Sequence, residues 1–447
     1  MPRIAVTKLP KDTGPAGWNR LLPAPGPATQ LTQHDTADVL IIGAGFAGLA
    51  AAARLMQLRP GAKVAVLEAT RVADGPAGRN SGFMIDLPHD LGSDNYGGAL
   101  DSDLAQTQDN RRGIAFAAQM AAEFGLTPEA FDQCGKINGA ASDKGHRHNL
   151  DFARHLAGMN EPHELLDAQA MADLTGISYY QSGLFTPGAA MIQPALFVRE
   201  VAQGLRSKGV RIFENSPVTA LERAGPDWIA QTPQGQITAP QVILAVNGHL
   251  NSFGFLPGRL MHVFTYASMT RALTPQETAR LGGAANWGLT PADPMGTTVR
   301  RISGIGGDRI VIRNRFTFDP SMEISQSRID RVARDHDRAF KARFGHLFNP
   351  AMEYRWGGRL CLSFNNVQVV RPLDSGLFAA CCQNGLGTAK GTLAGLLAAE
   401  SLCDHVTPAL TRALNAPPPR RLPPAPIAQL GATVRLKWAE AKAGKDL

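Results

Sequence analysis

The chain has 447 residues, of which 44% are hydrophobic and 19% are charged, a balance that suits a folded protein of two or three structural domains. Its net charge is +7, but the 45 Lys and Arg residues are spread along the chain, which favours a solvated basic surface over a nucleic-acid site. No apolar run reaches the roughly 18 residues of a membrane span, and five cysteines without a C-x-x-C pair argue against disulfides and against a metal site.

The first 35 residues are rich in proline and glycine, and we expect 1–35 to form an extended arm laid on the protein body. The stretch 1–17 contains charges and prolines but no apolar segment of the kind that a secretory signal requires. Because unpaired cysteines are typical of a reducing compartment, the sequence predicts a cytoplasmic protein.

A strand, a glycine-rich turn and a helix follow one another from residue 38. Apolar residues predict a strand over 38–43 and a helix over 46–58, and a second apolar run predicts a strand over 63–68. These three elements make a βαβ unit, which is the context in which a G-x-G-x-x-G turn indicates a dinucleotide site.

Each glycine of that turn has a mechanical role. Gly43 forms the tight turn, Gly45 lets backbone N–H groups approach a pyrophosphate, and Gly48 lets helix and strand pack closely. Glu68 stands twenty residues after Gly48, where a carboxylate accepts hydrogen bonds from the hydroxyl groups of an adenosine ribose. The sequence therefore predicts a dinucleotide whose phosphates lie at the N-terminus of the helix.

Periodicity predicts the remaining elements. We expect helices over 101–124, 164–175, 196–208, 328–344 and 390–403. We expect strands over 210–213, 228–232, 236–238, 241–248, 260–272, 308–318 and 376–382, the second and third of them joined as a hairpin. Prolines are dense after residue 416, so we expect no regular secondary structure in the tail.

Three separated segments resemble one family, the D-amino-acid-oxidase-like flavoproteins, which includes sarcosine oxidase, glycine oxidase and the γ-glutamylputrescine oxidases. The first segment is the βαβ unit with Glu68, the second comprises 183–199 and 214–218, and the third is the glycine-rich turn over 384–391. The resemblance covers most of residues 36–412, and the order of the segments along the chain carries it.

Within that family the chain most resembles the γ-glutamylputrescine oxidase branch. It shares the long proline-rich arm, the Gly-Arg-Asn-x-Gly loop over 78–82 and the Trp-Gly-Gly segment over 356–358. It departs from the branch at 83–86, which reads Phe-Met-Ile-Asp where polar or small residues are usual. The resemblance therefore implies the fold and leaves the substrate open.

The implied fold is α/β, with a glutathione-reductase-like, Rossmann-type FAD-binding domain and a second, mainly antiparallel β domain for the substrate. The second domain would cap the flavin ring. We expect an FAD-binding domain made of 36–90, 183–250 and 352–412, a substrate domain made of 91–182 and 251–351, and a proline-rich C-terminal tail over 413–447.

The resemblance also implies which residues bind FAD. The turn over 384–388 would place helix N–H groups near the C2 carbonyl and N1 of the flavin, where negative charge accumulates on reduction. The loop over 79–82 would lie against the flavin ring, and Val218 would contact the adenine through its backbone. The expected set is Gly43, Gly45, Phe46, Ala47, Gly48, Glu68, Ala69, Arg79, Asn80, Ser81, Gly82, Val218, Asn247, Gly248, Asn384, Gly385, Leu386, Gly387 and Thr388.

Four residues are expected near the substrate or the flavin ring. Tyr266 and Arg313 lie on predicted strands that should line the substrate side, where an arginine can anchor a carboxylate. Trp356 would join Tyr266 and the residues at 83–84 in an apolar wall. Lys390 is either a positive charge near the flavin or a lysine on the exposed first turn of a helix.

Cys361 has two interpretations. The segment 358–363 resembles the region in which monomeric sarcosine oxidase carries its covalent flavin cysteine, which would imply a thioether to the cofactor. Alternatively, Cys361 is a buried strand cysteine that acts as a small hydrophobic residue, and we favour this second interpretation.

We expect oxidation of the C–N bond of a small amine or N-alkyl amino acid, with hydride transfer to flavin N5 and hydrolysis of the imine in water. The electron acceptor would be O2 or an electron carrier, and the oligomeric state is open. Two alternatives remain. A flavin-dependent tRNA-modifying enzyme of the same fold has only the basic charge in its favour, and an NAD-dependent dehydrogenase shares only the first motif.

Overall fold

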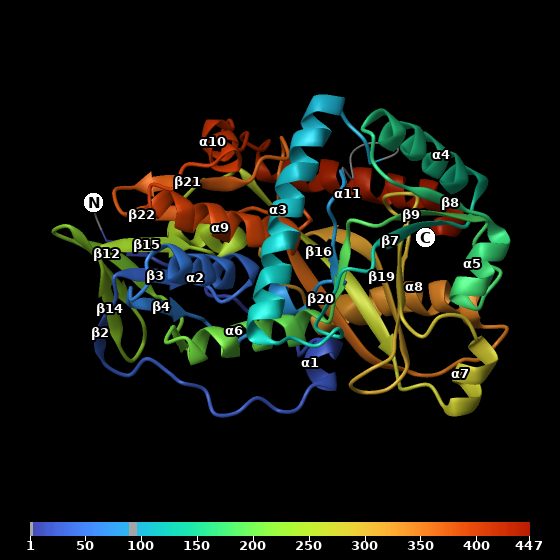
Figure 1. Cartoon of the computed structure of the whole chain (residues 1–447), viewed down its shortest axis with the longest axis horizontal. Coiled ribbons are helices and arrows are strands. Elements are labelled where there is room, and N and C mark those ends of the chain that lie inside the picture. Colours follow the sequence, from blue (N-terminus) through green and yellow to red (C-terminus); the bar gives the residue numbers. More distant parts are fainter. Residues whose placement is uncertain (1–2, 89–95) are drawn as a thin grey trace.

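The computed structural model describes residues 3–88 and 96–447 (Figure 1). A six-stranded sheet lies in one half of the molecule and an eight-stranded sheet in the other, and the long helix α3 (Leu100–Phe124) runs across the view between them. The N-terminus lies at the end with the six-stranded sheet, and the C-terminus lies in the half with the eight-stranded sheet.

The six-stranded sheet is the core of the first half. Its central strands are short, apolar and buried along their whole length, as is usual for parallel strands covered by helices. All neighbouring strands are parallel except the last pair. The order is β11 (Arg211–Phe213), β4 (Val64–Leu67), β3 (Val39–Ile42), β15 (Gln241–Leu244), β22 (Leu377–Cys381) and β21 (Val369–Asp374).

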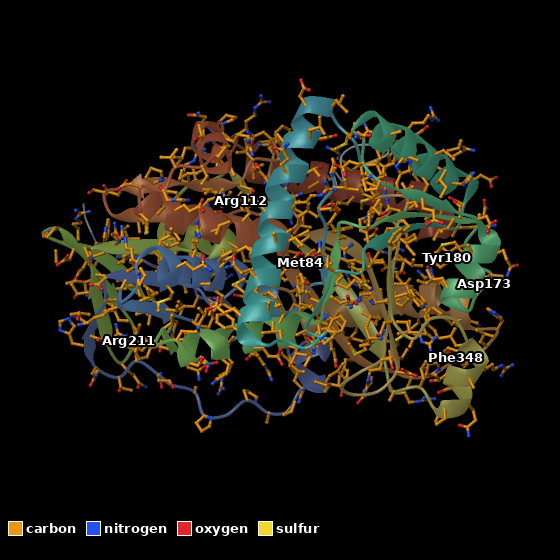
Figure 2. The ribbon with its side chains drawn as sticks, in the orientation of Figure 1. Met84, Arg112, Asp173, Tyr180, Arg211 and Phe348 are labelled. Atoms are coloured by element: carbon orange, nitrogen blue, oxygen red, sulfur yellow. The ribbon has the colours of Figure 1, made fainter. Side chains whose placement is uncertain are left out.

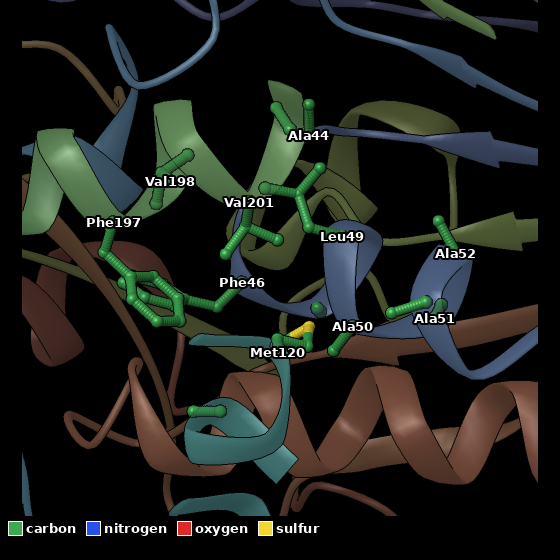
Figure 3. Close-up of a cluster of buried hydrophobic side chains, with 14 of the residues drawn as sticks. Ala44, Phe46, Leu49, Ala50, Ala51, Ala52, Met120, Phe197, Val198 and Val201 are labelled. Carbon is green, nitrogen blue, oxygen red and sulfur yellow. The ribbon is translucent and has the colours of Figure 1, made fainter. Parts of the chain in front are cut away.

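Three helices pack beside this sheet: α2 (Phe46–Leu58), α6 (Pro194–Ser207) and α9 (Ala389–Leu402). The many alanines of α2 suit its position, because α6 and α9 both contact it and leave little space for side chains. Phe46 at the start of α2 stacks on Phe197 of α6, with ring centroids 5.8 Å apart (Figure 3). This packing fixes the N-terminus of α2 relative to the sheet.

The eight-stranded sheet forms the second half. Its neighbouring strands are antiparallel except β17 (Trp287–Pro291) and β7 (Lys136–Ala140), which are parallel, and this confirms the expected mainly antiparallel domain. The order is β20 (Met352–Ser363), β16 (Leu260–Thr270), β19 (Arg309–Phe318), β18 (Thr298–Ile302), β17, β7, β9 (Ser182–Thr186) and β8 (Glu164–Leu166).

Helices and two small sheets complete the molecule. The predicted hairpin is present, because β13 (Asp227–Gln231) pairs antiparallel with β14 (Gln236–Ala239). Their five-stranded sheet also contains β1 (Ile4–Ala5), β2 (His34–Thr36) and β12 (Ala220–Ala224), and a three-stranded sheet contains β5 (Phe83–Met84), β6 (Phe131–Asp132) and β10 (Ala190–Ile192). The remaining α-helices are α1 (Gly17–Leu21), α4 (Asp143–Gly158), α5 (Ala168–Thr175), α7 (Pro275–Leu281), α8 (Gln326–Phe344), α10 (Pro408–Asn415) and α11 (Ala425–Ala443), and the short 3₁₀ helices are η1 (Pro76–Gly78), η2 (Asn247–Phe253) and η3 (Gly444–Asp446).

Both ends of the chain are more structured than the sequence predicts. The N-terminal arm contributes β1, β2 and α1, and Trp18 of α1 is fully buried. The tail contains the 19-residue helix α11, because its prolines are confined to the stretch before Ile427. The prediction of an irregular tail was therefore wrong from residue 425 onwards.

The predicted boundaries also differ from the structure in places. The predicted helix over 164–175 is a strand, β8, followed by the shorter helix α5. Strands β9 and β20 belong to the eight-stranded sheet, although the predicted boundaries put them in the FAD-binding pieces. The predicted boundary between 90 and 91 lies outside the described residues. Within the residues that are described, no helix has both the length and the apolar character that crossing a bilayer requires.

Candidate active site

One continuous pocket extends from the six-stranded sheet to the eight-stranded sheet. It holds about 2360 Å³ of empty space, its open mouth included. Gly48, Gly82 and Lys390 lie outside its lining. The other expected residues line it: Gly43, Gly45, Phe46, Ala47, Glu68, Ala69, Arg79, Asn80, Ser81, Val218, Asn247, Gly248, Tyr266, Arg313, Trp356, Asn384, Gly385, Leu386, Gly387 and Thr388.

The turn between β3 and α2 opens onto one end of the pocket. Gly43 has a φ of +106°, which favours glycine, and a Cβ on Gly48 would lie 1.8 Å from the carbonyl oxygen of Gly43. Helix α2 begins without a side-chain cap, and the N–H groups of 45–47 have no hydrogen-bond acceptor in the described part of the chain. These N–H groups and the helix dipole favour an anion at this position.

The carboxylate of Glu68 is held beside the same turn. Its Oε2 accepts a hydrogen bond from the backbone N–H of Ala44 at 2.9 Å, and its Oε1 accepts one from the N–H of Thr70 at 3.1 Å. Burial raises the pKa of Glu68, and the hydrogen bond from Ala44 opposes this shift. Because each carboxylate oxygen has more than one lone pair, Glu68 can also accept from ligand hydroxyls.

Val218 lies on the pocket wall close to the end of β4. Its side chain is 4% exposed, and its backbone N–H and C=O make no hydrogen bond among the residues described. Ser216 donates its backbone N–H to the carbonyl of Glu68 at 2.9 Å, which anchors this segment to β4. Val218 therefore offers a ligand an apolar surface together with a free donor and a free acceptor.

The turn between β22 and α9 brings a second helix N-terminus to the pocket. Two asparagine side chains hold this turn in place by accepting backbone hydrogen bonds. Oδ1 of Asn384 accepts the N–H of Ser363 at 2.7 Å, and Oδ1 of Asn247 accepts the N–H of Cys382 at 3.0 Å. The lining residues at 385–388 can therefore present mainly backbone groups to a ligand.

Arg79 uses its side chain to hold neighbouring segments together. Its Nε donates to the carbonyl of Asp74 at 2.8 Å, and its guanidinium also donates to the carbonyl of Gly357 at 3.2 Å. Its own carbonyl accepts the indole N–H of Trp356 at 3.0 Å. Arg79 and Trp356 thus tie the loop after β4 to strand β20.

A buried arginine that the sequence analysis did not identify fixes the rest of this loop. Arg300 on β18 donates to the carbonyls of Ser81, Gly82 and Ile192 at 3.1, 3.2 and 2.8 Å. Asn80 closes the loop locally, because its Oδ1 accepts the N–H of Gly82 at 2.8 Å. The loop that reaches the pocket is therefore held from the eight-stranded sheet.

Arg313 on β19 lines the part of the pocket formed by the eight-stranded sheet. Its guanidinium lies over the ring of Phe316, 4.7 Å from the centroid, and makes no hydrogen bond or ion pair within the described residues. Burial lowers its pKa to about 10, so Arg313 remains a cation at neutral pH. A partly buried cation with no counter-ion among the described residues can hold an anionic group of a ligand.

Two other predicted residues have different surroundings from those expected. Tyr266 borders the pocket, but its hydroxyl is paired with Thr317 at 2.6 Å and its ring packs in a cluster with Phe264. Burial raises the pKa of Tyr266 to about 12. Lys390 lies behind the pocket wall, where its ammonium donates to Gln106 at 3.3 Å. The structure therefore supports neither residue as a polar contact to the substrate or the flavin.

Of the residues expected to form an apolar wall, all but one line the pocket. Phe83, Ile85 and Trp356 line the pocket, whereas Met84, labelled near the middle of Figure 2, belongs to the core beside α2. The alternation of side chains along the strand explains the difference, because neighbouring residues of a strand face opposite sides.

Cys361 lines the pocket and is 2% exposed. A hydrogen bond with Cys382 and burial raise the pKa of the Cys361 thiol. Because the thiolate is the reactive form of cysteine, these surroundings make Cys361 a poor nucleophile. The covalent flavin link and its structural alternative both remain predictions.

A third group of lining residues was not predicted. Arg359 donates to Nε2 of His249 at 2.7 Å, and Nε2 of His262 pairs with Asn251 at 3.1 Å. Burial lowers the pKa of His249 to about 3 and that of His262 to about 4, so both imidazoles are neutral at pH 7. These side chains come from η2, β16 and β20, and no local sequence pattern links them.

These residues fit a large dinucleotide cofactor. The uncapped N-terminus of α2 suits its phosphates, and Glu68 suits a ribose. The pocket continues past the glycine-rich turn at 385–388, where α9 begins, to Arg313. In the parts of the chain that are described, no group of three or more His, Cys, Asp or Glu residues could hold a metal ion.

Comparisons with known proteins agree with this arrangement. A family model described as "FAD dependent oxidoreductase" (DAO) matches residues 38–401. "Probable oxidoreductase OrdL" of Haemophilus influenzae is 26% identical over 83% of this chain and 84% of its own length. "Gamma-glutamylputrescine oxidoreductase" of Escherichia coli K12 is 25% identical and covers 84% and 86%, respectively. The solved glycine oxidase of Geobacillus kaustophilus has the same fold, with a TM-score of 0.68 at 17% identity over 84% of this chain and 96% of its own.

Proposed function

The chain belongs to the family of FAD-dependent oxidoreductases, and from this premise we propose that it oxidises the C–N bond of a small amine that carries a carboxylate, such as an N-alkyl amino acid. When bound, FAD would supply the hydride acceptor, N5 of the flavin, and water would hydrolyse the imine that leaves the pocket. A relative that aligns with 84% of this chain is named "Gamma-glutamylputrescine oxidoreductase", and γ-glutamylputrescine is an amine.

The observation that carries the proposal is the guanidinium of Arg313, which has no hydrogen-bond or ion-pair partner among the described residues. It lies on the wall of the pocket, in the half formed by the eight-stranded sheet, and remains protonated at neutral pH. A guanidinium binds a carboxylate through two parallel hydrogen bonds, which fixes orientation as well as position. Arg313 would therefore hold the carboxylate and set the direction in which the C–H bond next to nitrogen points.

The charge balance of the pocket favours the neutral amine. Among the described lining residues the only carboxylate is Glu68, which lies beside the turn before α2, and the wall near Arg313 includes Trp356 and Val311. An apolar wall and a nearby cation both destabilise an ammonium group, whereas they leave a neutral amine unaffected. The nitrogen lone pair that assists loss of the hydride is therefore available.

We assign the cofactor to the rest of the pocket. The N–H groups at the start of α2 would hold the phosphates, Glu68 the ribose hydroxyls, and the backbone of Val218 the adenine. The backbone at 385–388 and the loop over 79–81 would contact the flavin ring, with Trp356 beyond it. Arg300 and Arg79 would position that loop through the carbonyls and strands that they hold.

The comparisons bear differently on two alternative functions, an NAD-dependent dehydrogenase and a tRNA-modifying enzyme. An NAD-dependent dehydrogenase is ruled out as the identity of the chain, because the matching family is FAD dependent and the match runs to residue 401. A tRNA-modifying activity has in its favour the positive net charge and a relative from Hahella chejuensis, a "tRNA 5-methylaminomethyl-2-thiouridine biosynthesis bifunctional protein", which is 26% identical over 44% of this chain and 30% of its own length. RNA binding that weakens steeply with salt would be its signature.

The proposal is tested by replacing Arg313. Arg313→Gln should weaken the apparent affinity for a carboxylate-bearing amine by roughly 10- to 100-fold, and Arg313→Lys by less, because a charge-assisted hydrogen bond contributes about 1.5–3 kcal/mol. The same variants should change the affinity for the matching amine without a carboxylate by less than about threefold. Equal losses for both amines would show that Arg313 has only a structural role.

The proposal also fixes a pH dependence for the wild-type protein. The rate of flavin reduction at saturating substrate should rise with pH toward the pKa of the bound amine, because only the neutral amine reacts. Stopped-flow reduction without oxygen measures this profile directly. A rate that is independent of pH would contradict the requirement for a neutral amine.

A further inference from the structure

A row of apolar side chains is exposed on the outer face of α11. Ile427 is 65% exposed, Leu430 68%, Val434 58% and Trp438 60%. Their spacing of three, four and four residues places them on one side of the helix. Single exposed apolar residues are ordinary on a protein surface, but a continuous row of four indicates a binding surface.

The opposite face of α11 attaches the helix to the eight-stranded sheet. Glu440 accepts hydrogen bonds from the guanidinium of Arg315 at 2.9 Å and from the backbone N–H of Phe316 at 3.0 Å. Leu436 and Ala443 pack into the cluster over this sheet. At about 100° per residue, positions 436, 440 and 443 lie about half a turn away from the apolar row. The helix is therefore fixed with the row facing outward.

The exposed charged side chains of residues 425–447 are all basic. Arg435, Lys437 and Lys442 are exposed, whereas the two acidic residues of 425–447 are buried, Glu440 at 8% and Asp446 at 2% exposure. Helical spacing places residues 435 and 442 on one side of the apolar row and residue 437 on the other. The row is thus bordered by positive charge along both edges.

We propose that α11 docks the protein on the surface of a membrane that contains anionic lipids. A helix with an apolar face that includes tryptophan, bordered by Lys and Arg, binds in the headgroup region and lies parallel to the bilayer. Trp438, with the ammonium of Lys442 3.4 Å from the centroid of its ring, would lie at the boundary between headgroups and acyl chains.

The charges favour a lipid surface over a second copy of the chain. In a symmetric dimer through α11, the basic residues of both copies would face one another, and their repulsion would oppose association. An anionic lipid surface instead attracts each Lys and Arg that comes within a Debye length. The proposal concerns how the protein is located and does not depend on its substrate.

Vesicle binding by the full-length FAD-loaded protein tests the proposal. It should co-sediment with vesicles of phosphatidylcholine and phosphatidylglycerol, and bind at least about tenfold more weakly to phosphatidylcholine alone or at high salt.

Two double variants separate the apolar and the basic contributions. Leu430→Ser combined with Trp438→Ser, and separately Arg435→Gln combined with Lys437→Gln, should each weaken binding at least about tenfold. Val406→Ser, which alters a 78% exposed residue outside α11, is the matched control and should bind like the wild type. FAD content and melting temperature verify that every variant is folded.

Tryptophan fluorescence gives a second readout from the unmodified chain. Anionic vesicles should shift the emission of Trp438 to shorter wavelength and protect it from acrylamide, and Trp438→Phe should abolish both effects. Co-sedimentation that is absent, or equal on neutral and anionic vesicles, would overturn the proposal. Protection of Trp438 without lipid that grows with protein concentration would overturn it in favour of a protein interface. The changes can be assigned to Trp438 because lipid and acrylamide do not reach the other four tryptophans, which are 0–3% exposed: Trp18, Trp228, Trp287 and Trp356.

Discussion

A Cβ placed on Gly395 would lie 1.9 Å from the backbone carbonyl oxygen of Ala47. Helices α2 and α9 are therefore in direct backbone contact at this point, although one lies near the start of the chain and the other near its end. The contact holds the N-termini of both helices at the same pocket. One glycine thus sets the distance between the proposed phosphate site and the proposed flavin site.

We expect Gly395→Ala to weaken FAD binding more than Gly431→Ala, a substitution in a helix where the added methyl group meets no neighbour. The added methyl group would force α2 and α9 apart, at a cost of about 1–3 kcal/mol, and would displace both helix N-termini. Thermal unfolding and FAD titration of the apoprotein measure the two effects. Gly431→Ala is the matched control, since a Cβ there meets nothing within 4 Å and should stabilise α11 slightly. A Gly395→Ala protein with normal affinity for FAD would contradict this role.

Glu68→Ala should lose FAD while retaining the fold. The variant removes the proposed contact to the ribose and also the acceptor of the Ala44 N–H, so we expect FAD to bind about 10- to 100-fold more weakly. Glu68→Gln keeps an acceptor for Ala44 and should lie between the wild type and Glu68→Ala. Recovery of the flavin fluorescence on dilution measures the affinity. Stoichiometric FAD in purified Glu68→Ala, at unchanged affinity, would place the ribose elsewhere.

The sequence predicts the cofactor half of the molecule well because its signals are local. The strand before Gly43, the turn and the helix after it are contiguous, and each glycine has a steric reason that a single segment reveals. The same holds for the strand and helix on either side of 384–388. Where the signal is local, prediction and structure agree to within a few residues.

The substrate half is less predictable because its contacts join distant segments. Arg300 holds the loop at 81–82 across the two halves, and no spacing in the sequence links these positions. Tyr266 was predicted to face the substrate, but whether its hydroxyl is free depends on Thr317, a neighbour across the sheet. The sequence does not predict helix α11, because the dense prolines before it indicate irregular structure. The stretch from Ile427 onwards contains no proline and is helical.

The buried histidines predict a loss of stability in mild acid. The ordinary pKa of histidine is 6.5, and burial lowers it to about 3 in His249 and about 4 in His262. Between pH 6.5 and 5 the unfolded chain therefore binds more protons than the folded protein, and the free energy of unfolding falls as the pH falls. The slope should approach about 1.4 kcal/mol per pH unit for each such histidine.

Urea denaturation at pH 7, 6 and 5 measures this slope, in a range above the ordinary pKa of the carboxylates. His262→Gln should make the dependence shallower, because one of the histidines that must stay neutral is gone. His34→Gln, at an exposed position, is the control and should leave the slope unchanged. A wild-type stability that is constant from pH 7 to pH 5 would contradict the neutral state of the two imidazoles.

We expect FAD to be released when the protein is denatured in acid. The thiol of Cys361 is buried and hydrogen-bonded to Cys382, and both conditions keep it protonated and unreactive toward the flavin. Precipitation in trichloroacetic acid followed by separation of pellet and supernatant shows where the yellow colour resides. Colour in the wild-type pellet that disappears in Cys361→Ser would instead establish the covalent link.

The class of substrate that reduces the flavin is the decisive measurement for the proposed oxidation of a C–N bond. The purified protein is mixed without oxygen with small amines, N-alkyl amino acids and 2-hydroxy acids, and the loss of flavin absorbance is followed by stopped flow. We predict rapid reduction by at least one amine that carries a carboxylate, a much higher half-saturating concentration of that amine in Arg313→Gln, and no reduction by the hydroxy acids. Rapid reduction by a hydroxy acid while every amine is inert would contradict the account, because it would place the chemistry at a C–O bond.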